Sequence, residues 1–359
     1  MQKFSKVSTF MVAMIALTFC AVSCKSSVDD EPTKYTVTVA SSIEHGKVSV
    51  DNSSAEAGTT IKLTATADDG YELDSYSVKD ASSNAITVTD DTFVMPKSNV
   101  TVSATFVVVT YIGTKKPSLA KAVGDIVFTD GSAMPYADFT ALGDDAKAEK
   151  KTSAIALIFY SGTSLNSGDD TATSRTLGVG LKHNKLAWCL DSANAYSKKI
   201  ETILCKPDDG GSAGNYTWTG SQDRNGSNNL EQIATFLAAA EDVTDDTATE
   251  ANYPAFYFAK NYKETATNIA DTDYEDGWYL PSFAELFQIY AYRKDGTDGF
   301  DLDAASQALG GDEFGTNWYW SSSQYGSGRY AYGFLFLAGV WNSILKDSIH
   351  YVCAIRSFN

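Results

Sequence analysis

Beyond the first 34 residues, hydrophobic and polar positions alternate with a period of two through the N-terminal third of the chain. The alternation runs through residues 35–39, 47–50 and 60–66, and it returns in residues 100–106. Val and Thr dominate these runs, and Gly, Asn and Asp separate them, which is typical of short strands joined by turns. Because the alternation gives each strand one apolar face, the sequence predicts a small, mainly β domain over residues 35–107.

The pattern becomes mixed in residues 123–359, and we place the domain boundary near residue 110. The apolar run 154–160 predicts a buried strand, and residues 176–181 and 186–189 predict another pair of strands. Residues 230–240 carry apolar side chains at helical spacing, which predicts a helix.

A second helix is predicted to begin at Ser282. Ser282 and Glu285 have the spacing of a capping box, in which each side chain accepts a hydrogen bond from a backbone amide at the start of the helix. Phe283, Leu286 and Tyr290 then fall on one face of that helix. The C-terminal domain is therefore predicted to be mixed, with both helices and strands, as in the α+β class that the resemblance described below implies.

Residues 1–23 have the pattern of a signal peptide. Lys3 and Lys6 give a positive start, and a mostly apolar run follows in residues 10–22, shorter than the roughly 20 residues that span a membrane. The small residues before Cys24 resemble a bacterial lipoprotein signal, in which this cysteine becomes the acylated first residue. A plain secretory signal cleaved nearby is the alternative.

Residues 24–34 are polar and contain a proline, which predicts a flexible tether. The acidic cluster Asp29, Asp30 and Glu31 resembles the export tag of surface lipoproteins in Bacteroides-like bacteria, and a merely solvated linker is the alternative. Together these features predict a lipid-anchored protein of the outer membrane that is exposed at the cell surface.

The composition narrows the possible functions. The chain has 28 Lys and Arg against 45 Asp and Glu, which gives a formal net charge of -17. Nucleic-acid binding depends on Lys and Arg that neutralise phosphates, so we expect no nucleic-acid partner. Only 3 His and 5 Cys are present, which favours a binding protein over an enzyme. Cys189 and Cys205 can form a disulfide in an exported protein, and buried free thiols are the alternative.

The predicted β domain resembles a known bacterial surface repeat. Residues 57–78 and 92–106 are similar to internalin-type B repeats, whose recurring elements are matched by Gly58, the Gly70-Tyr71 pair and the Met95-Pro96 pair. The resemblance implies a stalk or spacer without chemistry of its own.

Three segments of the C-terminal domain carry a second resemblance: 277–286 (GWYLPSFAEL), 319–323 (YWSSS) and 351–358 (YVCAIRSF). In this order they are similar to the C-terminal domain of collagen-like adhesins, which is related to the C-type-lectin and formylglycine-generating-enzyme fold. The resemblance implies a C-type-lectin-like domain over residues 123–359. The large apolar residues of these segments are expected to be scaffold, and Arg356 is expected to form an ion pair or to cap carbonyls.

The chemistry of the related enzymes is not expected here. Formylglycine-generating enzymes need a pair of cysteines near the C-terminus, where this chain has Cys353 alone, and the calcium-dependent sugar-binding triplets of C-type lectins are missing. The acidic residues 271–276 lack the glycine of an EF-hand loop, which leaves a loose calcium site or a solvated acidic turn. We therefore expect no catalytic residue, no defined metal site and no cofactor.

Residues 324–350 combine apolar side chains with Gly and Ser between two scaffold motifs. Alternation there places Tyr332, Phe334 and Phe336 on one side of a strand and the intervening residues on the other. If the aromatic set packs inward, the other set forms an exposed apolar cluster, which marks a partner site. Two buried faces of a core strand are the alternative. The candidate ligand contacts are Tyr325, Gly326, Gly328, Arg329, Tyr330, Gly333, Leu335, Leu337, Val340, Trp341, Ser343, Leu345 and His350.

The same segment resembles the variable proteins of diversity-generating retroelements, which place a mutated C-terminal segment on a C-type-lectin-like scaffold. Diversification acts on adenines, commonly in Asn codons, and cannot produce Trp or Lys. From Gly326 to His350, only Trp341 and Lys346 fall outside the residues that it can reach. Cys353 is compatible with another such product.

These observations predict a surface-anchored lipoprotein that binds a protein or glycan ligand through its C-terminal segment, with no chemical step. A fimbrial or surface-layer subunit that binds copies of itself is one alternative. A degenerate relative of formylglycine-generating enzymes is the other.

Overall fold

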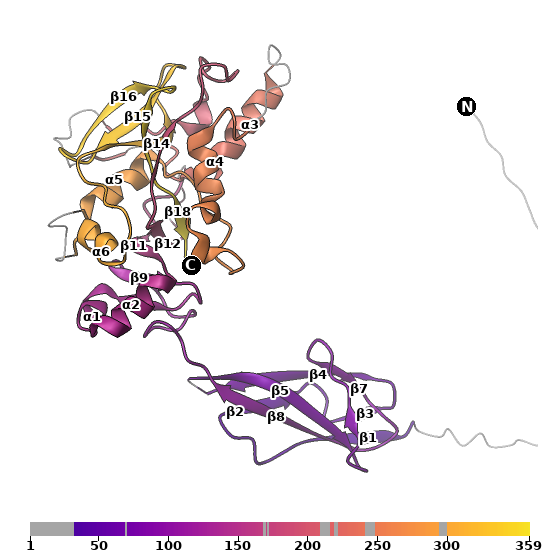
Figure 1. Ribbon diagram of the computed structural model, residues 1–359. Helices are drawn as coiled ribbons and strands as arrows, with labels where there is room; N and C mark the ends of the chain where they lie inside the picture. Colours follow the sequence, from indigo (N-terminus) through magenta and orange to yellow (C-terminus); the bar gives the residue numbers. More distant parts are fainter. Residues whose placement is uncertain are drawn as a thin grey trace, which may run out of the picture. The chain divides into compact units, whose positions relative to one another are not determined.

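The computed structural model describes residues 32–68, 70–167, 170, 172–208, 216–218, 222–240, 248–293 and 300–359, and the chain divides into two compact units, Met1–Thr110 and Tyr111–Asn359 (Figure 1). The predicted signal peptide, Cys24 and most of the tether lie outside the described residues. Within the described part of the chain, no helix has the length and apolar character needed to cross a membrane.

The N-terminal unit is mainly β, as its alternation predicted. One sheet has the order β3-β1-β8-β5-β6, and a smaller one has the order β2-β4-β7. Ile61, Leu63 and Val102 are among the buried residues of its core. The strands are β1 (Lys34–Val39), β2 (Gly46–Val50), β3 (Ser54–Glu56), β4 (Thr60–Ala67), β5 (Tyr71–Asp80), β6 (Ala85–Ile86), β7 (Thr92–Val94) and β8 (Val100–Val108).

The elements that carry the B-repeat resemblance shape turns in this unit. Gly58 and Gly70 have φ of 89° and 84°, values that glycine adopts without steric cost. The amide of Gly58 donates to the carbonyl of Met95 at 2.8 Å, and the Met95 side chain is buried. These residues therefore act as structural elements of the repeat.

The C-terminal unit contains two five-stranded sheets with the orders β10-β9-β11-β12-β18 and β13-β17-β14-β15-β16. Its strands are β9 (Asp125–Phe128), β10 (Ala133–Pro135), β11 (Ala154–Gly162), β12 (Arg175–Gly180), β13 (Asn184–Ala187), β14 (Trp318–Gln324), β15 (Tyr330–Leu335), β16 (Val340–Leu345), β17 (Ile349–Val352) and β18 (Ile355–Ser357). Its α-helices are α1 (Tyr136–Thr140), α2 (Asp144–Ser153), α3 (Asn229–Ala239), α4 (Pro254–Lys260), α5 (Phe283–Ala291) and α6 (Leu302–Ala308). The last strand, β18, pairs antiparallel with β12 and so joins the end of the chain to the first sheet.

The predicted strand at 154–160 is β11, and residues 154–160 are buried throughout. The two segments predicted as a further pair of strands correspond to β12 and β13, but they lie in different sheets. β12 pairs with β11 and β18, whereas β13 pairs with β17. The pairing of β12 with β18 and of β13 with β17 joins segments that are distant in sequence, and a local pattern does not specify such pairings.

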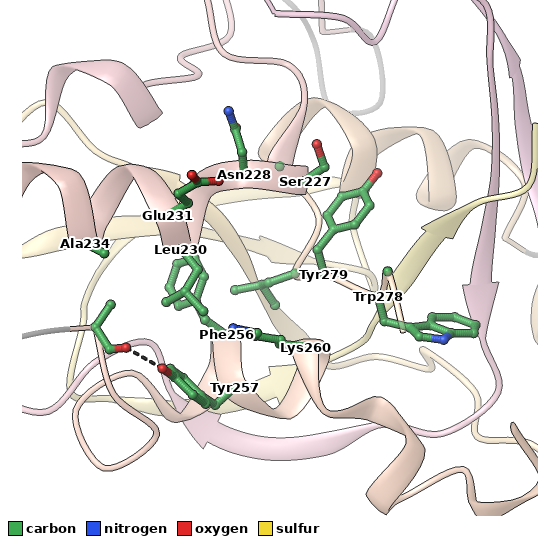
Figure 2. Close-up of a pocket in the computed structure, with 14 residues that line it drawn as sticks. Ser227, Asn228, Leu230, Glu231, Ala234, Phe256, Tyr257, Lys260, Trp278 and Tyr279 are labelled. Atoms are coloured by element: carbon green, nitrogen blue, oxygen red, sulfur yellow. Dashed lines mark hydrogen bonds between the residues drawn. The ribbon is translucent and has the colours of Figure 1, made fainter. Parts of the chain in front are cut away.

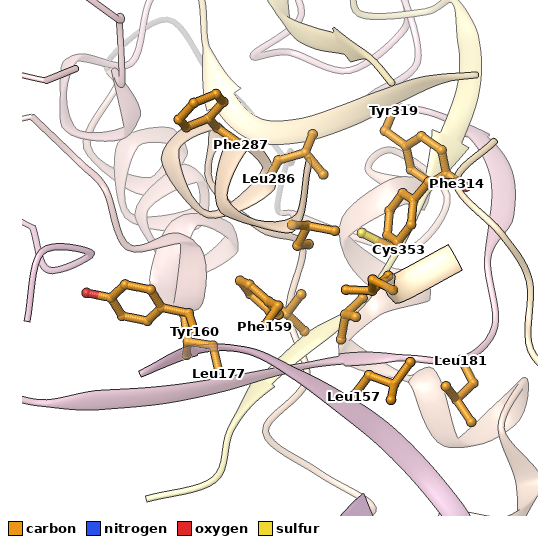
Figure 3. Close-up of a cluster of buried hydrophobic side chains, with 14 of the residues drawn as sticks. Leu157, Phe159, Tyr160, Leu177, Leu181, Leu286, Phe287, Phe314, Tyr319 and Cys353 are labelled. Atoms are coloured by element: carbon orange, nitrogen blue, oxygen red, sulfur yellow. The ribbon is translucent and has the colours of Figure 1, made fainter. Parts of the chain in front are cut away.

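Helix α5 lies between the two sheets and contacts β11 in one and β14 and β15 in the other. Figure 3 shows the apolar cluster around it, in which Leu286 of α5, Phe159 of β11 and Tyr319 of β14 are buried. A second cluster, with Trp188, Trp278 and Trp320 among its members, lies beneath α3 and α4. The site residues described below are attached to these two cores.

The cysteines of the C-terminal unit resolve one alternative left open by the sequence. Cys189, Cys205 and Cys353 are all buried as thiols. Burial raises the pKa of the Cys205 and Cys353 thiols well above the usual range. The structure therefore has buried thiols and no Cys189–Cys205 disulfide.

Candidate functional site

The capping box predicted at Ser282 is present and belongs to a buried polar network. The Ser282 hydroxyl accepts a hydrogen bond from the Glu285 amide at 3.2 Å, and the Glu285 carboxylate accepts from the Ser282 amide at 2.8 Å. The same carboxylate accepts from the Gly226 amide at 3.0 Å and from the Tyr279 hydroxyl at 2.9 Å, and it pairs with Arg175 at 2.9 Å. Glu285 therefore joins three segments that are far apart in sequence.

The serines of the YWSSS motif attach β14 to its surroundings. The Ser323 hydroxyl accepts from the Phe283 amide at 2.9 Å, and the Ser322 hydroxyl accepts from the Asn229 side chain at 2.8 Å. The Ser321 hydroxyl donates to the carbonyl of Tyr332 on β15 at 2.9 Å. All three serines are fully buried, so this motif acts as scaffold.

Arg356 also has a structural role, of the carbonyl-capping kind that the sequence suggested. Its guanidinium donates to the carbonyls of Asp276 at 2.7 Å and Asp273 at 3.1 Å. It lies 4.8 Å from the centre of the Tyr274 ring. Arg356 thereby links the last strand to the segment before the GWYLPS motif.

The candidate ligand segment forms β15, β16 and β17 beside β14. Tyr332, Phe334 and Phe336 are at most 1% exposed, as predicted for the inward set. They pack on α5, where the Tyr332 and Phe334 rings lie 5.1 and 5.9 Å from that of Phe283. One face of this sheet is therefore held rigidly against the core.

The opposite face of the sheet carries half-buried apolar side chains at its open end, beyond the fully buried Trp320. Trp318, Leu335 and Val340 are directly paired neighbours on β14, β15 and β16, so their side chains lie in one row. Ile344 covers Gly333, because a Cβ placed on Gly333 would lie 2.4 Å from the Ile344 Cδ1 and 3.5 Å from the Trp318 ring. We call the set Trp318, Leu335, Val340, Ile344 and His350 the outer surface.

His350 and Leu337 extend this face in two directions. The His350 ring lies 6.5 Å from the Trp318 ring, and burial lowers the pKa of His350, so the imidazole is neutral at pH 7. Leu337, in the turn between β15 and β16, is 62% exposed. Both lie in the exposed or half-exposed part of the predicted segment.

Several predicted contacts do not lie on the outer surface. Gly333 is buried beneath Ile344, and a Cβ on Gly328 would lie 2.0 Å from the Ser197 carbonyl oxygen. Trp341 faces the core, 5.3 Å from the Tyr332 ring and 6.4 Å from the Phe283 ring. Neighbouring atoms therefore close off all three positions, which makes them structural.

The remaining predicted residues lie at the margins of the hairpin. Gly326 is exposed, and the Arg329 guanidinium lies 5.5 Å from the Tyr196 ring. The strand register places three further candidate contacts on the inner face of the hairpin or at its rim, where they are half-buried: Tyr330, Ser343 and Leu345. Tyr325 is half-buried against Tyr332, with ring centres 5.4 Å apart.

Sequence reasoning missed two central members of the outer surface, Trp318 and Ile344. From the sequence, Trp318 is expected to be buried scaffold because it is a large apolar residue next to the YWSSS segment, but the structure leaves it half-buried. Trp318 and Trp320 share a strand face, and only the order of strands shows that Trp318 lies at its open end. Ile344 lay inside the candidate segment, but nothing in the alternation marked it over its neighbours.

A separate cavity of about 640 Å³ opens between α3, α4 and residues 277–280 (Figure 2). Its wall is apolar, with Leu230, Phe256 and Leu280 among the lining residues, and Glu231 and Lys260 add one charge of each sign. Figure 2 also shows the Tyr257 hydroxyl bonded to the carbonyl of Ala248. No candidate ligand contact lines this cavity, although residues 277–280 of its lining belong to the GWYLPSFAEL segment.

Two of the acidic residues considered for calcium, Glu275 and Asp276, form ion pairs with Lys263. The Lys263 ammonium lies 3.5 Å from the Glu275 carboxylate and 3.2 Å from that of Asp276, and Glu275 also accepts from the Asp271 amide at 3.1 Å. Across the described residues, no three His, Cys, Asp or Glu side chains come together as a metal site would require. The carbonyl of Asp273 is occupied by Arg356.

Comparison with known proteins identifies the N-terminal unit. Residues 35–110 match the family described as the divergent InlB B-repeat domain, which confirms the resemblance found in this segment. A solved structure of a fimbrial protein from Bacteroides ovatus is similar over 91% of this chain and 69% of its own, with 12% sequence identity and a TM-score of 0.44. The comparison with curated proteins gives no match.

Proposed function

We propose that this chain is a bacterial cell-surface protein that binds a protein or glycan ligand through the outer surface of its C-terminal sheet. The observation that carries the proposal is the row of Trp318, Leu335 and Val340, half-buried apolar side chains on the face of the sheet opposite Tyr332, Phe334 and Phe336. Clustered apolar groups of this kind mark partner sites. The rigid backing lowers the entropic cost of ordering the surface on binding.

The match of residues 35–110 to the divergent InlB B-repeat domain supports the cell-surface location. The resemblance to such repeats implies a spacer of a bacterial surface protein. In the proposed arrangement, Cys24 carries the lipid at the outer membrane, residues 24–34 are the tether, and the β domain is the spacer. The membrane is then contacted through the lipid alone.

We further propose a C-type-lectin-like fold for the C-terminal unit. The return of the final strand to the first sheet and the hairpin between two scaffold motifs support it. The burial pattern also supports diversification by a retroelement. The two residues that adenine mutagenesis cannot produce, Trp341 and Lys346, both pack inward, and Lys346 is fully buried. Leu335, Leu337, Val340 and Ile344, which it can produce, are exposed or half-exposed.

Binding is tested by screening the labelled chain against a glycan array and a displayed library of random peptides. The ligand recovered is then measured against Leu337→Lys and Ile344→Lys, with Leu119→Lys as the matched control. Leu119 is an exposed leucine of the same unit, 48% exposed, outside the outer surface. We expect both outer-face variants to lose at least about tenfold in affinity and the control to lose none. Equal affinity in all variants would contradict the proposal.

The proposed activity has no chemical step. Metal-dependent turnover of any substrate that is lost with Cys353→Ser would contradict this and favour the enzyme alternative. The diversification proposal has a genomic test: a reverse transcriptase gene and a near-copy of the 3′ end, differing at adenines, should lie beside this gene.

A further inference from the structure

Strand β16 is an edge strand without the features that usually prevent edge-to-edge pairing. It is the last strand of the sheet β13-β17-β14-β15-β16, and its six residues, VWNSIL, contain neither a charge nor a proline. It pairs with β15 over all six residues without a register shift. Natural edge strands are usually short, charged, bulged or interrupted by proline.

The other sheet edges in the described residues follow that rule. β3, β6, β7, β10 and β18 have three residues or fewer. The longer edges β2 and β13 contain Lys47 and Lys185. Among these edge strands, β16 is the one that is both long and uncharged.

The outward-facing backbone groups of β16 follow from its register. The Lys346 amide donates to the Arg329 carbonyl at 3.2 Å, next to the paired residues Tyr330 and Leu345. In an antiparallel ladder, alternate residues turn their amide and carbonyl groups to the partner strand. The groups of Trp341, Ser343 and Leu345 therefore point away from β15.

These three residues allow the strand to pair with itself. If a second copy is placed antiparallel with Ser343 on the two-fold axis, each Ser343 faces the other, and Trp341 faces Leu345 of the second copy. In this register, the amide and carbonyl groups that point away from β15 in one copy face the same kind of groups in the other copy. The pairing allows about six backbone hydrogen bonds between the copies. The Leu345 carbonyl already accepts from Ser348 at 3.0 Å, and its second lone pair stays available.

We propose that β16 pairs antiparallel with β16 of a second copy of this chain, about a two-fold axis at Ser343. An uncharged strand suits this contact, because in a self-pairing strand any charge near the axis would face the same charge on the second copy. The pairing would join two five-stranded sheets into one and place the two outer surfaces side by side. It depends on the strand edge and is independent of any ligand bound by the outer surface.

The experiment is a charge exchange at Ser343, measured by analytical ultracentrifugation of residues 25–359, which hold both compact units. We expect wild-type chain to form a reversible dimer over about 1–300 µM. Ser343→Glu and Ser343→Lys each place like charges directly opposite across the axis, so each should weaken association at least about tenfold. An equimolar mixture of the two variants places opposite charges together and should associate at least about tenfold more tightly than either alone.

Ser192→Glu and Ser192→Lys are the matched controls, because Ser192 is an exposed serine of the same unit outside β16. They should dimerise like wild type, alone and mixed. The unfolding midpoint of each variant, read by tryptophan fluorescence, shows whether it is folded. A monomeric wild-type chain, undiminished association of the single Ser343 variants, or a mixture no better than its components would each overturn the proposal.

Discussion

Replacing Glu285 by alanine tests whether the buried network holds the C-terminal unit together. The Glu285 side chain is fully buried, and the Arg175 side chain is 8% exposed. Removing the carboxylate leaves the guanidinium buried without its counter-charge, and breaking such a pair costs about 3–5 kcal/mol. The amides of Ser282 and Gly226 also lose their acceptor.

These losses share one group, so they do not add in full. We expect a total of about 4 kcal/mol in the free energy of unfolding. With a urea slope of about 3 kcal/mol/M, the midpoint falls by about 1.3 M. Glu285→Gln keeps an oxygen for the capping bonds but loses the charge, so its midpoint should lie between wild type and alanine.

Tryptophan fluorescence during urea unfolding is a suitable assay, because all six tryptophans lie between residues 188 and 341, in the C-terminal unit. Glu231→Gln is the control, since Glu231 is an exposed residue of α3 and should leave the midpoint within about 0.2 M. A Glu285→Ala midpoint within that same margin would refute the role given to the network.

Three further predictions address other features. Gly226→Ala should lower the free energy of unfolding by about 1–3 kcal/mol, read as a lower urea midpoint, because the new Cβ would lie 2.6 Å from the Leu280 carbonyl oxygen. Gly326→Ala is the control and should leave the midpoint unchanged, because a Cβ on Gly326 would have no neighbouring atom within 4 Å. Burial lowers the pKa of Lys346 to about 8. Between about pH 8 and the unfolded pKa of about 10.4, the folded state therefore binds fewer protons than the unfolded state, and the free energy of unfolding rises with pH. Lys346→Met should remove this rise and increase the free energy of unfolding most at pH 7, by about 3 kcal/mol, in urea titrations at a series of pH values. Cys24→Ser should abolish incorporation of an alkyne-labelled fatty acid and release the chain from the membrane fraction, and labelling that survives the substitution would place the lipid elsewhere.

The features predicted best are those fixed by local chemistry. Alternation marked the N-terminal strands, and the Ser282–Glu285 spacing located the start of α5. The same alternation separated the inward aromatic residues Tyr332, Phe334 and Phe336 from their neighbours. Each of these signals depends on residues within one strand or one helical turn.

The features missed depend on which strands meet. β12 and β13 both pair with strands from the last eleven residues of the chain, and no local pattern specifies that choice. Trp318 belongs to the outer surface only because β14 lies beside β15 with Trp318 opposite Leu335. The partners of Glu285, namely Arg175 and Gly226, come from segments 110 and 59 residues away.

The hairpin of β15 and β16 obeys two different physical constraints on its two faces. On the inner face, replacing Phe334 or Phe336 would leave a cavity among packed rings, which costs about 3–5 kcal/mol. On the outer face, Leu335 and Val340 are half-buried at the open end of the row, so their replacement removes less packing. Since the two sets alternate along the same strands, this fold can keep a fixed scaffold while its outward side chains vary, which is what a binding surface with changing specificity requires.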